Sequence, residues 1–375
     1  MLECKFCGCT ESDNWYKAGN DYYCDDCCEN LDTSHCFVCD RDYLDDEIRF
    51  GLTYFDGDNH YNVDICDYCL DDLHYCNECD TYISDGWFDY DMDMCEACSR
   101  DHCFESVCSY HTRPEIEPLN GAKWSDNLIG IEIEIEQKDG VSKDYQVIHA
   151  VNSIVPNRSI WFNEDGSLNH TGIELITQPM TLDFLPSMHL DKVFEKLIEL
   201  GYESYNTGVC GLHIHFSPNW YGYDSDNLVS LVNFVHSNRD DFERLSKRRN
   251  FQYCTIPSYT YDDIDDMRYY VDCSDFSDNH CIWLNKDPGT ETLEIRLMRG
   301  TLNYDSFEKS IRLWCYLIEK SKSVPWIESS NPSSWLNDMP IDLLDFCLNR
   351  NAFRQSWTGI VREYEKKEVK QLVCA

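Results

Sequence analysis

A strict alternation of isoleucine and glutamate runs from Gly130 to Glu136. A side-chain period of two is typical of a strand whose two faces meet different surroundings. The pattern predicts that the three isoleucines enter a core and that the three glutamates share the opposite face. Closely spaced carboxylates repel one another, and a divalent cation offsets this repulsion. Glu132 and Glu134 are therefore candidate metal ligands, although a solvent-exposed acidic face would give the same pattern.

Two later segments repeat the alternation with other polar residues. Gly172–Thr177 is a predicted strand with Glu174 between apolar neighbours. Gly211–Ser217 is another, and it places His213 and His215 on one face. Two histidines at positions i and i+2 of a strand favour a metal ligand or a phosphate contact over ordinary packed residues. We predict that these side chains join the glutamates.

A fourth alternating segment, Thr292–Thr301, places Glu294 and Arg296 on one face. A salt bridge between strands would explain this pair simply. Arg299 is one residue out of phase with them, so it joins their face only if the chain bends near Gly300. Arginine beside carboxylates also suits the binding of a phosphate.

Helical periodicity fills much of the chain between and after these strands. The clearest helix is predicted for Leu190–Leu200, with Val193, Phe194, Leu197 and Ile198 on one side. The other predicted helices cover residues 142–155, 228–236, 241–246, 306–321, 341–348 and 352–372. Strands and helices in this arrangement predict a mixed α+β domain from residue 128 to residue 375.

Charge and composition exclude some partners and favour others. The 375-residue chain carries 69 acidic against 31 basic residues, a formal net charge of −38. Such a field repels nucleic acids and anionic membranes, so we expect neither as a partner. We find no apolar run long enough to cross a bilayer and no signal-peptide pattern, so a cytoplasmic location is expected. In a reducing compartment, the 23 cysteines predict metal binding rather than disulfides.

Six Cys-x-x-Cys pairs occupy the first hundred residues. They are Cys4/Cys7, Cys24/Cys27, Cys36/Cys39, Cys66/Cys69, Cys76/Cys79 and Cys95/Cys98. Taken two by two, they predict three structural Zn²⁺ sites with four thiolate ligands each. Gly8 follows the first pair, where such a turn often needs a positive φ. Iron–sulfur clusters are a lesser alternative, and an interleaved pairing as in RING modules stays open.

The cysteine-rich region predicts a small metal-stabilised domain, residues 1–108, followed by a linker over residues 109–127. Residues 1–120 contain 30 acidic and 6 basic residues, unlike a nucleic-acid finger. Acidic and aromatic residues between the cysteines favour docking of a protein or peptide, which could be the substrate. Cys103, Cys108 and His111 are weaker candidates for a further metal site.

Carboxylates, imidazoles and arginine on four strands together predict a two-metal nucleotide site with Mg²⁺ or Mn²⁺. A basic cluster, Arg244 with Lys247–Arg249, is either a further phosphate contact or a helix end that compensates nearby acids. We find no Walker A or GxGxxG sequence. A non-catalytic zinc scaffold and a metal-dependent hydrolase or nuclease are the alternatives.

Four motifs, GIEIEIE, DGSLN…GIELITQP, CGLHIHFS and TLEIRLMRGTLN, resemble the phage-type amidoligase family. That family is similar to the glutamine synthetase and glutamate–cysteine ligase superfamily of ATP-dependent carboxylate–amine ligases. The resemblance spans roughly residues 110–320. It implies a curved antiparallel sheet forming half a barrel, with flanking helices, and a location in the host cytoplasm if the protein is phage-encoded. The superfamily contains rings and monomers, so the oligomeric state stays open.

The resemblance also implies roles for individual residues. Glu134 and Glu174 would hold one Mg²⁺, and a second would be held by Glu132, His213 and Glu294. The ATP phosphates would contact His215, Arg296 and Arg299, to which we add Arg249 of the basic cluster. The reaction would form an acyl phosphate from a substrate carboxylate and ATP, and an amine would then displace phosphate. We find no counterpart of the glutamine synthetase residues that bind ammonium or clamp an amino acid.

Overall fold

The computed structural model of the chain contains two compact units, Met1–His102 (unit 1) and Cys103–Ala375 (unit 2). It describes residues 2–354 except 29–31, 58, 91, 110–111, 170, 253, 258–263, 266–267, 269–270, 272–279 and 286–290. The units divide after residue 102, whereas we expected a boundary after residue 108. The reason is that strand β11 (Val107–Cys108) pairs with a strand of unit 2. None of the described helices is both long and apolar enough to cross a membrane.

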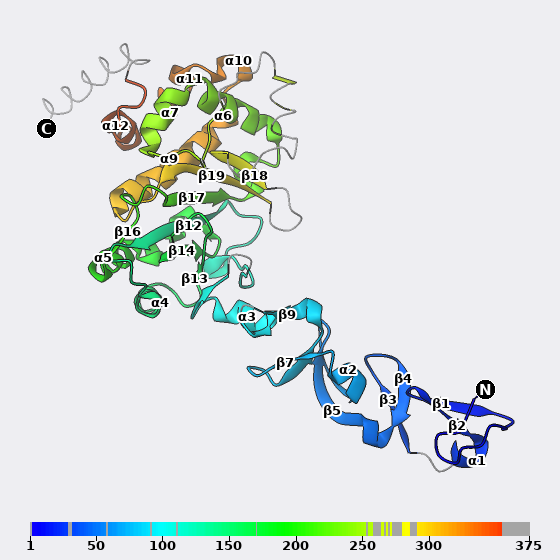
Figure 1. The fold of residues 1–375 in the computed structure, drawn as a ribbon. Helices are drawn as coiled ribbons and strands as arrows, with labels where there is room; N and C mark the ends of the chain where they lie inside the picture. Colours follow the sequence, from blue (N-terminus) through cyan, green and yellow to red (C-terminus); the bar gives the residue numbers. More distant parts are fainter. Residues whose placement is uncertain are drawn as a thin grey trace, which may run out of the picture. The chain divides into compact units, whose positions relative to one another are not determined.

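The described part of unit 1 contains three two-stranded antiparallel sheets and one four-stranded sheet that includes a parallel pair (Figure 1). Its strands are β1 (Trp15–Ala18), β2 (Asp21–Cys24), β3 (Thr33–Cys36), β4 (Arg41–Leu44), β5 (Ile48–Phe55), β6 (His60–Cys66), β7 (His74–Cys76), β8 (Thr81–Ile83), β9 (Phe88–Asp89) and β10 (Met94–Cys95). Its helices are α1 (Asp25–Cys28), α2 (Asp67–Leu70) and α3 (Glu96–His102). Each helix directly follows a strand that ends in a cysteine, so one Cys-x-x-Cys pair spans the end of the strand and the first turn of the helix.

The other three Cys-x-x-Cys pairs form tight turns. The residue after each pair, Gly8, Asp40 or Asp80, has a positive φ between 53° and 74°. The expected positive φ at Gly8 is thus confirmed, and its N–H bonds to the carbonyl of Cys4 at 2.8 Å. Asp40 makes the equivalent bond to Cys36 at 3.0 Å. Aspartate tolerates this conformation better than most residues with a Cβ, so glycine is not required at every turn.

Unit 2 is a mixed α+β fold around a nine-stranded sheet (Figure 1). The strand order is β11-β13-β14-β12-β17-β19-β18, and β15 and β16 pair with the ends of β12. The remaining bounds are β12 (Leu128–Gln137), β13 (Ile160–Asn163), β14 (Gly172–Thr177), β15 (Met180–Thr181), β16 (Tyr202–Glu203), β17 (Gly211–Phe216), β18 (Ile282–Asn285) and β19 (Thr292–Arg299). All pairs are antiparallel except β11 with β13.

The alternation in the sequence separates the faces of this sheet as predicted. The isoleucines at 129, 131, 133 and 135 of β12 are at most 1% exposed and lie in one apolar core with Phe194 and Phe307. That core includes side chains of α4 (Asp144–Asn152), α5 (Leu190–Leu200), α6 (Ser225–Ser237), α7 (Arg239–Ser246), α9 (Tyr304–Ser321) and α12 (Ile341–Asn349). Two short helices, α10 (Trp326–Ser329) and α11 (Pro332–Leu336), precede α12. The polar face of the strands is therefore left to the candidate site.

The helices predicted within the described residues are present, but some of their bounds and buried faces differ from those predicted. Leu190–Leu200 is a helix with the expected bounds, but Ile198 is 54% exposed rather than buried with its neighbours. The buried side is formed instead by Leu190, Val193, Phe194 and Leu197. The helix expected over residues 352–372 lies almost wholly outside the described residues.

The segment expected to be a linker is part of unit 2. The side chain of Gln178 donates to the carbonyl of Glu115 at 2.8 Å and accepts from the N–H of Glu117 at 3.0 Å. The N–H of Leu119 donates to the carbonyl of Pro179 at 2.8 Å. Backbone groups of this segment are thus held by hydrogen bonds to Gln178 and Pro179.

Candidate functional site

Unit 1 contains three clusters of four cysteines whose Sγ atoms lie within 4.8 Å of one another. The second cluster is Cys36, Cys39, Cys66 and Cys69, and the third is Cys76, Cys79, Cys95 and Cys98. Both match the sequential pairing predicted from the spacing. Tetrahedral sites with four cysteines are typical of structural zinc, so the three clusters are compatible with zinc binding.

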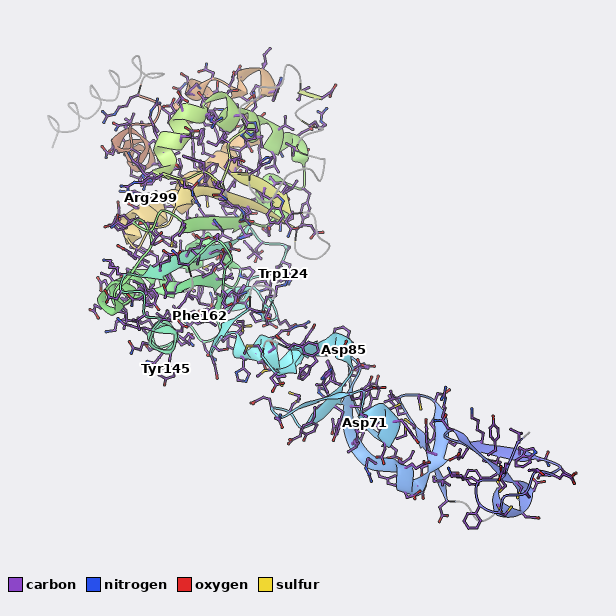
Figure 2. All side chains as sticks on the ribbon, viewed as in Figure 1. Asp71, Asp85, Trp124, Tyr145, Phe162 and Arg299 are labelled. Atoms are coloured by element: carbon purple, nitrogen blue, oxygen red, sulfur yellow. The ribbon has the colours of Figure 1, made fainter. Side chains whose placement is uncertain are left out.

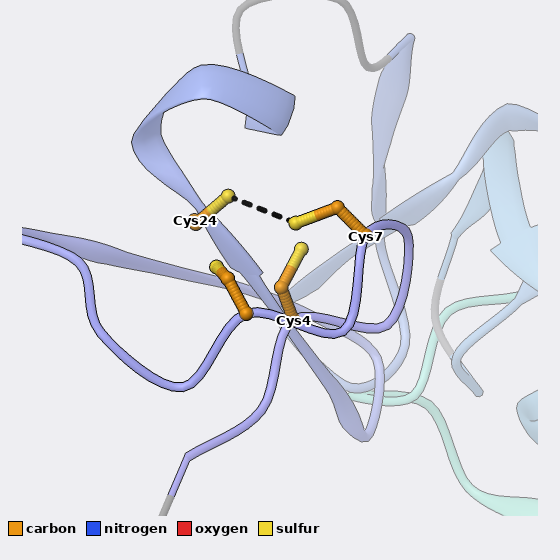
Figure 3. A group of neighbouring side chains, drawn as sticks. Cys4, Cys7 and Cys24 are labelled. Atoms are coloured by element: carbon orange, nitrogen blue, oxygen red, sulfur yellow. Dashed lines mark hydrogen bonds between the residues drawn. The ribbon is translucent and has the colours of Figure 1, made fainter.

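The first cluster differs from the prediction by one member. It contains Cys4, Cys7, Cys24 and Cys9, whereas the spacing predicted Cys27. Figure 3 shows Cys4, Cys7 and Cys24 converging, with Cys7 and Cys24 sulfurs 3.6 Å apart. Cys9 comes close because the turn at Gly8 folds the chain back, so that Cys4 N–H donates to the carbonyl of Cys9 at 2.8 Å. Cys27 stays in hydrogen-bond contact with Cys24, which leaves five thiols around one site.

One thiol in each of the second and third clusters has a lowered pKa. Burial opposes ionisation of Cys36, but N–H groups led by that of Cys66 outweigh it and lower the pKa to about 7. The same balance lowers the pKa of Cys76 to about 7, with the N–H of Cys95 contributing most. Burial and neighbouring thiols raise the pKa of Cys69 and Cys98. A divalent cation would offset this crowding of thiolates, which is the chemical fit expected for zinc.

The candidates for a further site do not form one among the described residues. Cys103 and Cys108 are both buried in unit 2, and their carbonyls accept from the N–H groups of Phe162 and Glu164. No metal-binding group within the described ranges contains either cysteine. His111 lies outside those ranges.

The polar face of the sheet in unit 2 brings the predicted carboxylates and imidazoles together. In the register, Glu134 lies opposite Glu174 of β14, and Glu132 lies opposite His213 of β17. His215 then lies opposite Glu294 of β19. Because alternate side chains of a strand share a face, these cross-strand pairs place all of the groups on one surface.

His213 is at the centre of this surface. Its Nδ1 lies 2.8 Å from an oxygen of Glu132 and 3.6 Å from one of Glu294, and its Nε2 lies 3.5 Å from an oxygen of Glu134. Two potential metal-binding groups result, Glu132–His213–Glu294 and Glu134–Glu174–His213, each with ligand atoms within 4.8 Å. The carboxylates are divided between the two groups in the way that the family resemblance implies, and His213 belongs to both.

Burial and mutual repulsion shape the charges of these carboxylates. Burial, followed by the charges of Glu132 and Glu134, raises the pKa of Glu174 well above its ordinary value. Burial also raises the pKa of Glu134. For Glu132, burial acts in the same direction, but His215 and His213 outweigh it and hold the pKa well below the ordinary value. Carboxylates packed this closely without a lysine among them are a donor set that suits Mg²⁺ or Mn²⁺.

His215 and Arg296 add positive charge beside the carboxylates. His215 Nε2 lies 2.8 Å from Glu132, and although burial opposes its charge, Glu132 and Glu294 raise its pKa to about 9. Arg296 Nε lies 2.6 Å from an oxygen of Glu294, and its guanidinium lies 5.5 Å from the ring centre of Trp283. This end of the surface could therefore receive a phosphate next to the metal ligands.

A cavity of about 1130 Å³ opens over this surface. Six of the predicted site residues line it: Glu132, Glu174, His213, His215, Glu294 and Arg296. Trp124, Trp161 and Trp283 add aromatic walls, and Asn163 and Asp165 add polar groups near Glu174. Trp161 Nε1 and Asn163 Oδ1 are buried and make no hydrogen bond in the described structure. Unpaired buried polar atoms in a cavity are groups that a ligand can satisfy.

Trp161 and Asn163 were not singled out from the sequence, although a signal was present. They alternate with the core residues Ile160 and Phe162, so the period-two rule would have assigned them to the face of the glutamates. Asp165 lies two residues after Asn163, and its charge raises the pKa of Glu174 further.

Arg248 is a second residue whose position the sequence did not reveal. Its guanidinium donates to the carbonyls of Arg296 at 2.9 Å and Leu297 at 3.3 Å. It also lies over Gly211, where an added Cβ would come within 2.3 Å of Nη2. Gly211 in turn donates its N–H to Glu134. Only the general basic character of residues 244–249 pointed to it, since no pattern tells which of four neighbouring cations turns inward.

Arg299 and Arg249 do not line the cavity. Arg299 reaches the face of the histidines through a register shift between β17 and β19, which places it opposite Gly211. The expected bend near Gly300 is therefore a β-bulge earlier in the strand, since one extra residue reverses the side-chain phase. Arg249 is exposed in the loop after α7. Both belong to a separate group of cations.

Models of known protein families give no match to this chain, and no curated protein matches its sequence. The site is therefore interpreted from its own residues.

Proposed function

We propose that unit 2 is an ATP-dependent ligase that joins a carboxylate to an amine. The observation that carries this proposal is the meeting of four glutamates and His213 from four strands in two groups that share this histidine, with His215 beside them. Two adjacent cation sites beside an arginine suit the transfer of a phosphoryl group. The resemblance to the phage-type amidoligase family supports the same reaction, and with it a glutamine synthetase-like half-barrel sheet.

The residues fit two Mg²⁺ ions. Glu134 and Glu174 would hold one, and Glu132, Glu294 and His213 Nδ1, which faces both of these carboxylates, would hold the other. Bound Mg²⁺ would neutralise charge on the transferred phosphoryl group. His215 and Arg296 line the cavity beside these groups, so we assign the ATP phosphates to them and leave out Arg249 and Arg299.

The reaction would have two steps. A substrate carboxylate oxygen attacks the γ-phosphorus, the bond from that phosphorus to the bridging oxygen breaks, and ADP leaves with the electron pair. The amine nitrogen then attacks the acyl carbon, the bond to the phosphate oxygen breaks, and the nitrogen loses a proton as phosphate leaves. Arg296 stabilises charge on the phosphoryl oxygens. The aromatic walls of the cavity keep water from the acyl phosphate.

The two ends of the cavity suit different parts of this reaction. Arg296 and Trp283, at the β18–β19 end, favour the phosphate donor. At the β13–β14 end, Trp161 offers a donor and Asn163 an acceptor, both unpaired in the described structure. A carboxylate or amine substrate entering there would meet the phosphate over the glutamates between the two ends.

The test is ADP release by the zinc-loaded protein with Mg²⁺, ATP and mixtures of acids and amines, combined with mass spectrometry of the products. Glu132→Gln should lower the rate at least about a hundredfold. Glu195→Gln, on the exposed side of α5, is the matched control and should leave it unchanged. Wild-type activity in Glu132→Gln would refute the assignment of the site. Binding of three zinc ions without any nucleotide binding would favour a non-catalytic scaffold instead.

We further propose that unit 1 docks a protein or peptide that carries one of the substrates. Phe6 and Phe37, between the cysteines of two tight turns, are 78% and 46% exposed. The ring of Phe37 lies 5.3 Å from that of Tyr61, which extends this aromatic surface within an acidic unit. Exposed aromatic side chains amid negative charge suit a basic partner with apolar anchors. Phe37→Ala should weaken modification of a protein substrate while small-molecule turnover stays unchanged; equal effects on both would argue against docking.

A further inference from the structure

A group of four cations lies outside the cavity, beside the far end of the β17–β19 pair. Its members are Lys247, Arg249, Arg299 and Arg350. The cavity is lined by Thr292, at the start of β19, whereas Arg299 is the last residue of that strand. Figure 2 shows Arg299 and the cavity residue Trp124 on different sides of unit 2. The four cations thus form a feature distinct from the cavity.

The fold holds these side chains in place through backbone carbonyls and aromatic rings. The two bonds of Arg248 to β19 fix the loop that carries Lys247 and Arg249 beside that strand. Lys247 Nζ donates to the carbonyl of Arg350 at 3.0 Å, and Arg350 Nη1 donates to the carbonyl of Leu245 at 2.9 Å. The guanidinium of Arg350 lies 4.2 Å from the ring centre of Phe346, and that of Arg299 lies 5.3 Å from the ring centre of Tyr205.

These cations repel one another. Burial, followed by the charge of Arg299, lowers the pKa of Arg350 to about 10. Burial and then Arg249 lower the pKa of Arg299, and burial followed by Arg350 and Arg299 lowers that of Lys247. Within the part of the chain that the structure describes, none of the four has a carboxylate within 4.0 Å. In a protein of net charge −38, four cations gathered without an acidic neighbour are unexpected.

We propose that Lys247, Arg249, Arg299 and Arg350 form a binding site for a phosphate-bearing polyanion, separate from the cavity. Guanidinium groups bind phosphate oxygens through paired N–H donors, and a lysine adds a further donor. An anion with several charges would replace the repulsion between the cations by attraction. The four residues of the site are all cations, so they would contact phosphate oxygens directly rather than through a Mg²⁺ ion.

Two sources of the phosphate fit this chemistry. Arg299 lies opposite Gly211, whose N–H donates to Glu134, so the cations are close to the proposed metal ligands. The polyphosphate of a nucleotide bound at the glutamates could reach the site from there. Alternatively, a separate phosphorylated ligand occupies it while the nucleotide is bound.

The experiment is calorimetric titration of the zinc-loaded, full-length protein with inorganic pyrophosphate in the absence of Mg²⁺. We expect saturable binding that weakens as salt is added, because exposed charges are screened. The double variant Arg249→Gln/Arg299→Gln should bind at least about tenfold more weakly. Arg244→Gln is the control, because Arg244 lies in the same region but is paired with Asp241 at 2.9 Å. No binding, or equal binding by the double variant, would overturn the proposal.

The melting temperature of the ligand-free variants distinguishes loss of the binding site from misfolding. Removing a cation from a repelling group should leave the melting temperature of the ligand-free protein unchanged or raise it, whereas a purely structural role predicts a lower value. Competition then identifies the source. If a non-hydrolysable ATP analogue with Mg²⁺ displaces pyrophosphate, the site receives the nucleotide; if both bind together, it receives a separate ligand. Neither the melting temperature nor the binding titration requires catalytic turnover, so the anion-site proposal can be tested even if the ligase proposal fails.

Discussion

Gly211 is the position where one methyl group should disturb the site most. In Gly211→Ala, the new Cβ would lie 2.3 Å from Arg248 Nη2 and 2.8 Å from His213 Nε2. Real Cβ atoms do not approach heavy atoms this closely, so one of these two groups must move. The arginine is held by two carbonyls of β19, and the histidine is held between glutamates. Neither can yield without losing contacts.

The size of the effect follows from those contacts. If Arg248 moves, it gives up one or both of its charged hydrogen bonds, at a cost of about 2 kcal/mol. For a unit of this size, that corresponds to a melting temperature lower by roughly 4–8 °C. If His213 moves instead, both groups of potential metal ligands lose their shared member, and affinity for Mn²⁺ should fall at least about tenfold.

Thermal unfolding and calorimetric titration with Mn²⁺ measure the two outcomes. Gly130→Ala is the matched control. Gly130 lies on β12, on the same face of the sheet as Gly211, and its added Cβ would meet only His215 Cβ, at an ordinary 3.5 Å. The double variant Gly211→Ala/Arg248→Ala removes the contact with Arg248 but keeps the one with His213, so a Mn²⁺ affinity that stays low in it would show that His213 is the group that moves. If Gly211→Ala melts and binds Mn²⁺ like the wild type, the close packing of Arg248 and His213 described above is wrong.

Three further predictions concern the metal sites. Cys36→Ser should lower the zinc content from three ions to two per chain by plasma mass spectrometry, whereas Cys28→Ser, outside the three clusters, should keep three. In the first cluster, Cys9→Ser should lower zinc affinity in a chelator competition, and loss of zinc only in Cys27→Ser would show that Cys27 is the fourth ligand. Mg²⁺ binding should strengthen as the pH rises above the range in which an ordinary carboxyl group titrates, since the raised pKa of Glu174 means that a bound cation must displace its proton. Glu174→Gln should remove this proton release, measured by calorimetry in buffers of different ionisation enthalpy.

The sequence predicted those parts of the site that depend on strand parity. Glu132, His213 and Glu294 lie on three different strands, yet each was assigned to the correct face by its apolar neighbours alone. The spacing of cysteines likewise predicted the second and third clusters, because a tight turn and the strand end fix which sulfurs can meet. Both rules act over a few residues, so no knowledge of the tertiary structure was needed.

Other features depended on contacts between distant segments. Cys9 enters the first cluster through a turn, although it belongs to no Cys-x-x-Cys pair. The phase of Arg299 depends on a bulge that exists only when β17 and β19 pair. Arg248 is distinguished from its basic neighbours only by the carbonyls that it meets on β19. The local sequence does not predict any of these three features, and each could be identified only in the folded structure.

The place of His213 between the two groups would make two bound cations unequal. An imidazole nitrogen that donates its lone pair to one metal leaves the other nitrogen protonated in the neutral ring. A cation at Nδ1, beside Glu132 and Glu294, would therefore turn Nε2 into a donor aimed at Glu134. The second cation would then be held by carboxylates alone, and its affinity would depend on whether the first cation is bound. The two ions should load in a preferred order, with the occupancy of one setting the affinity for the other.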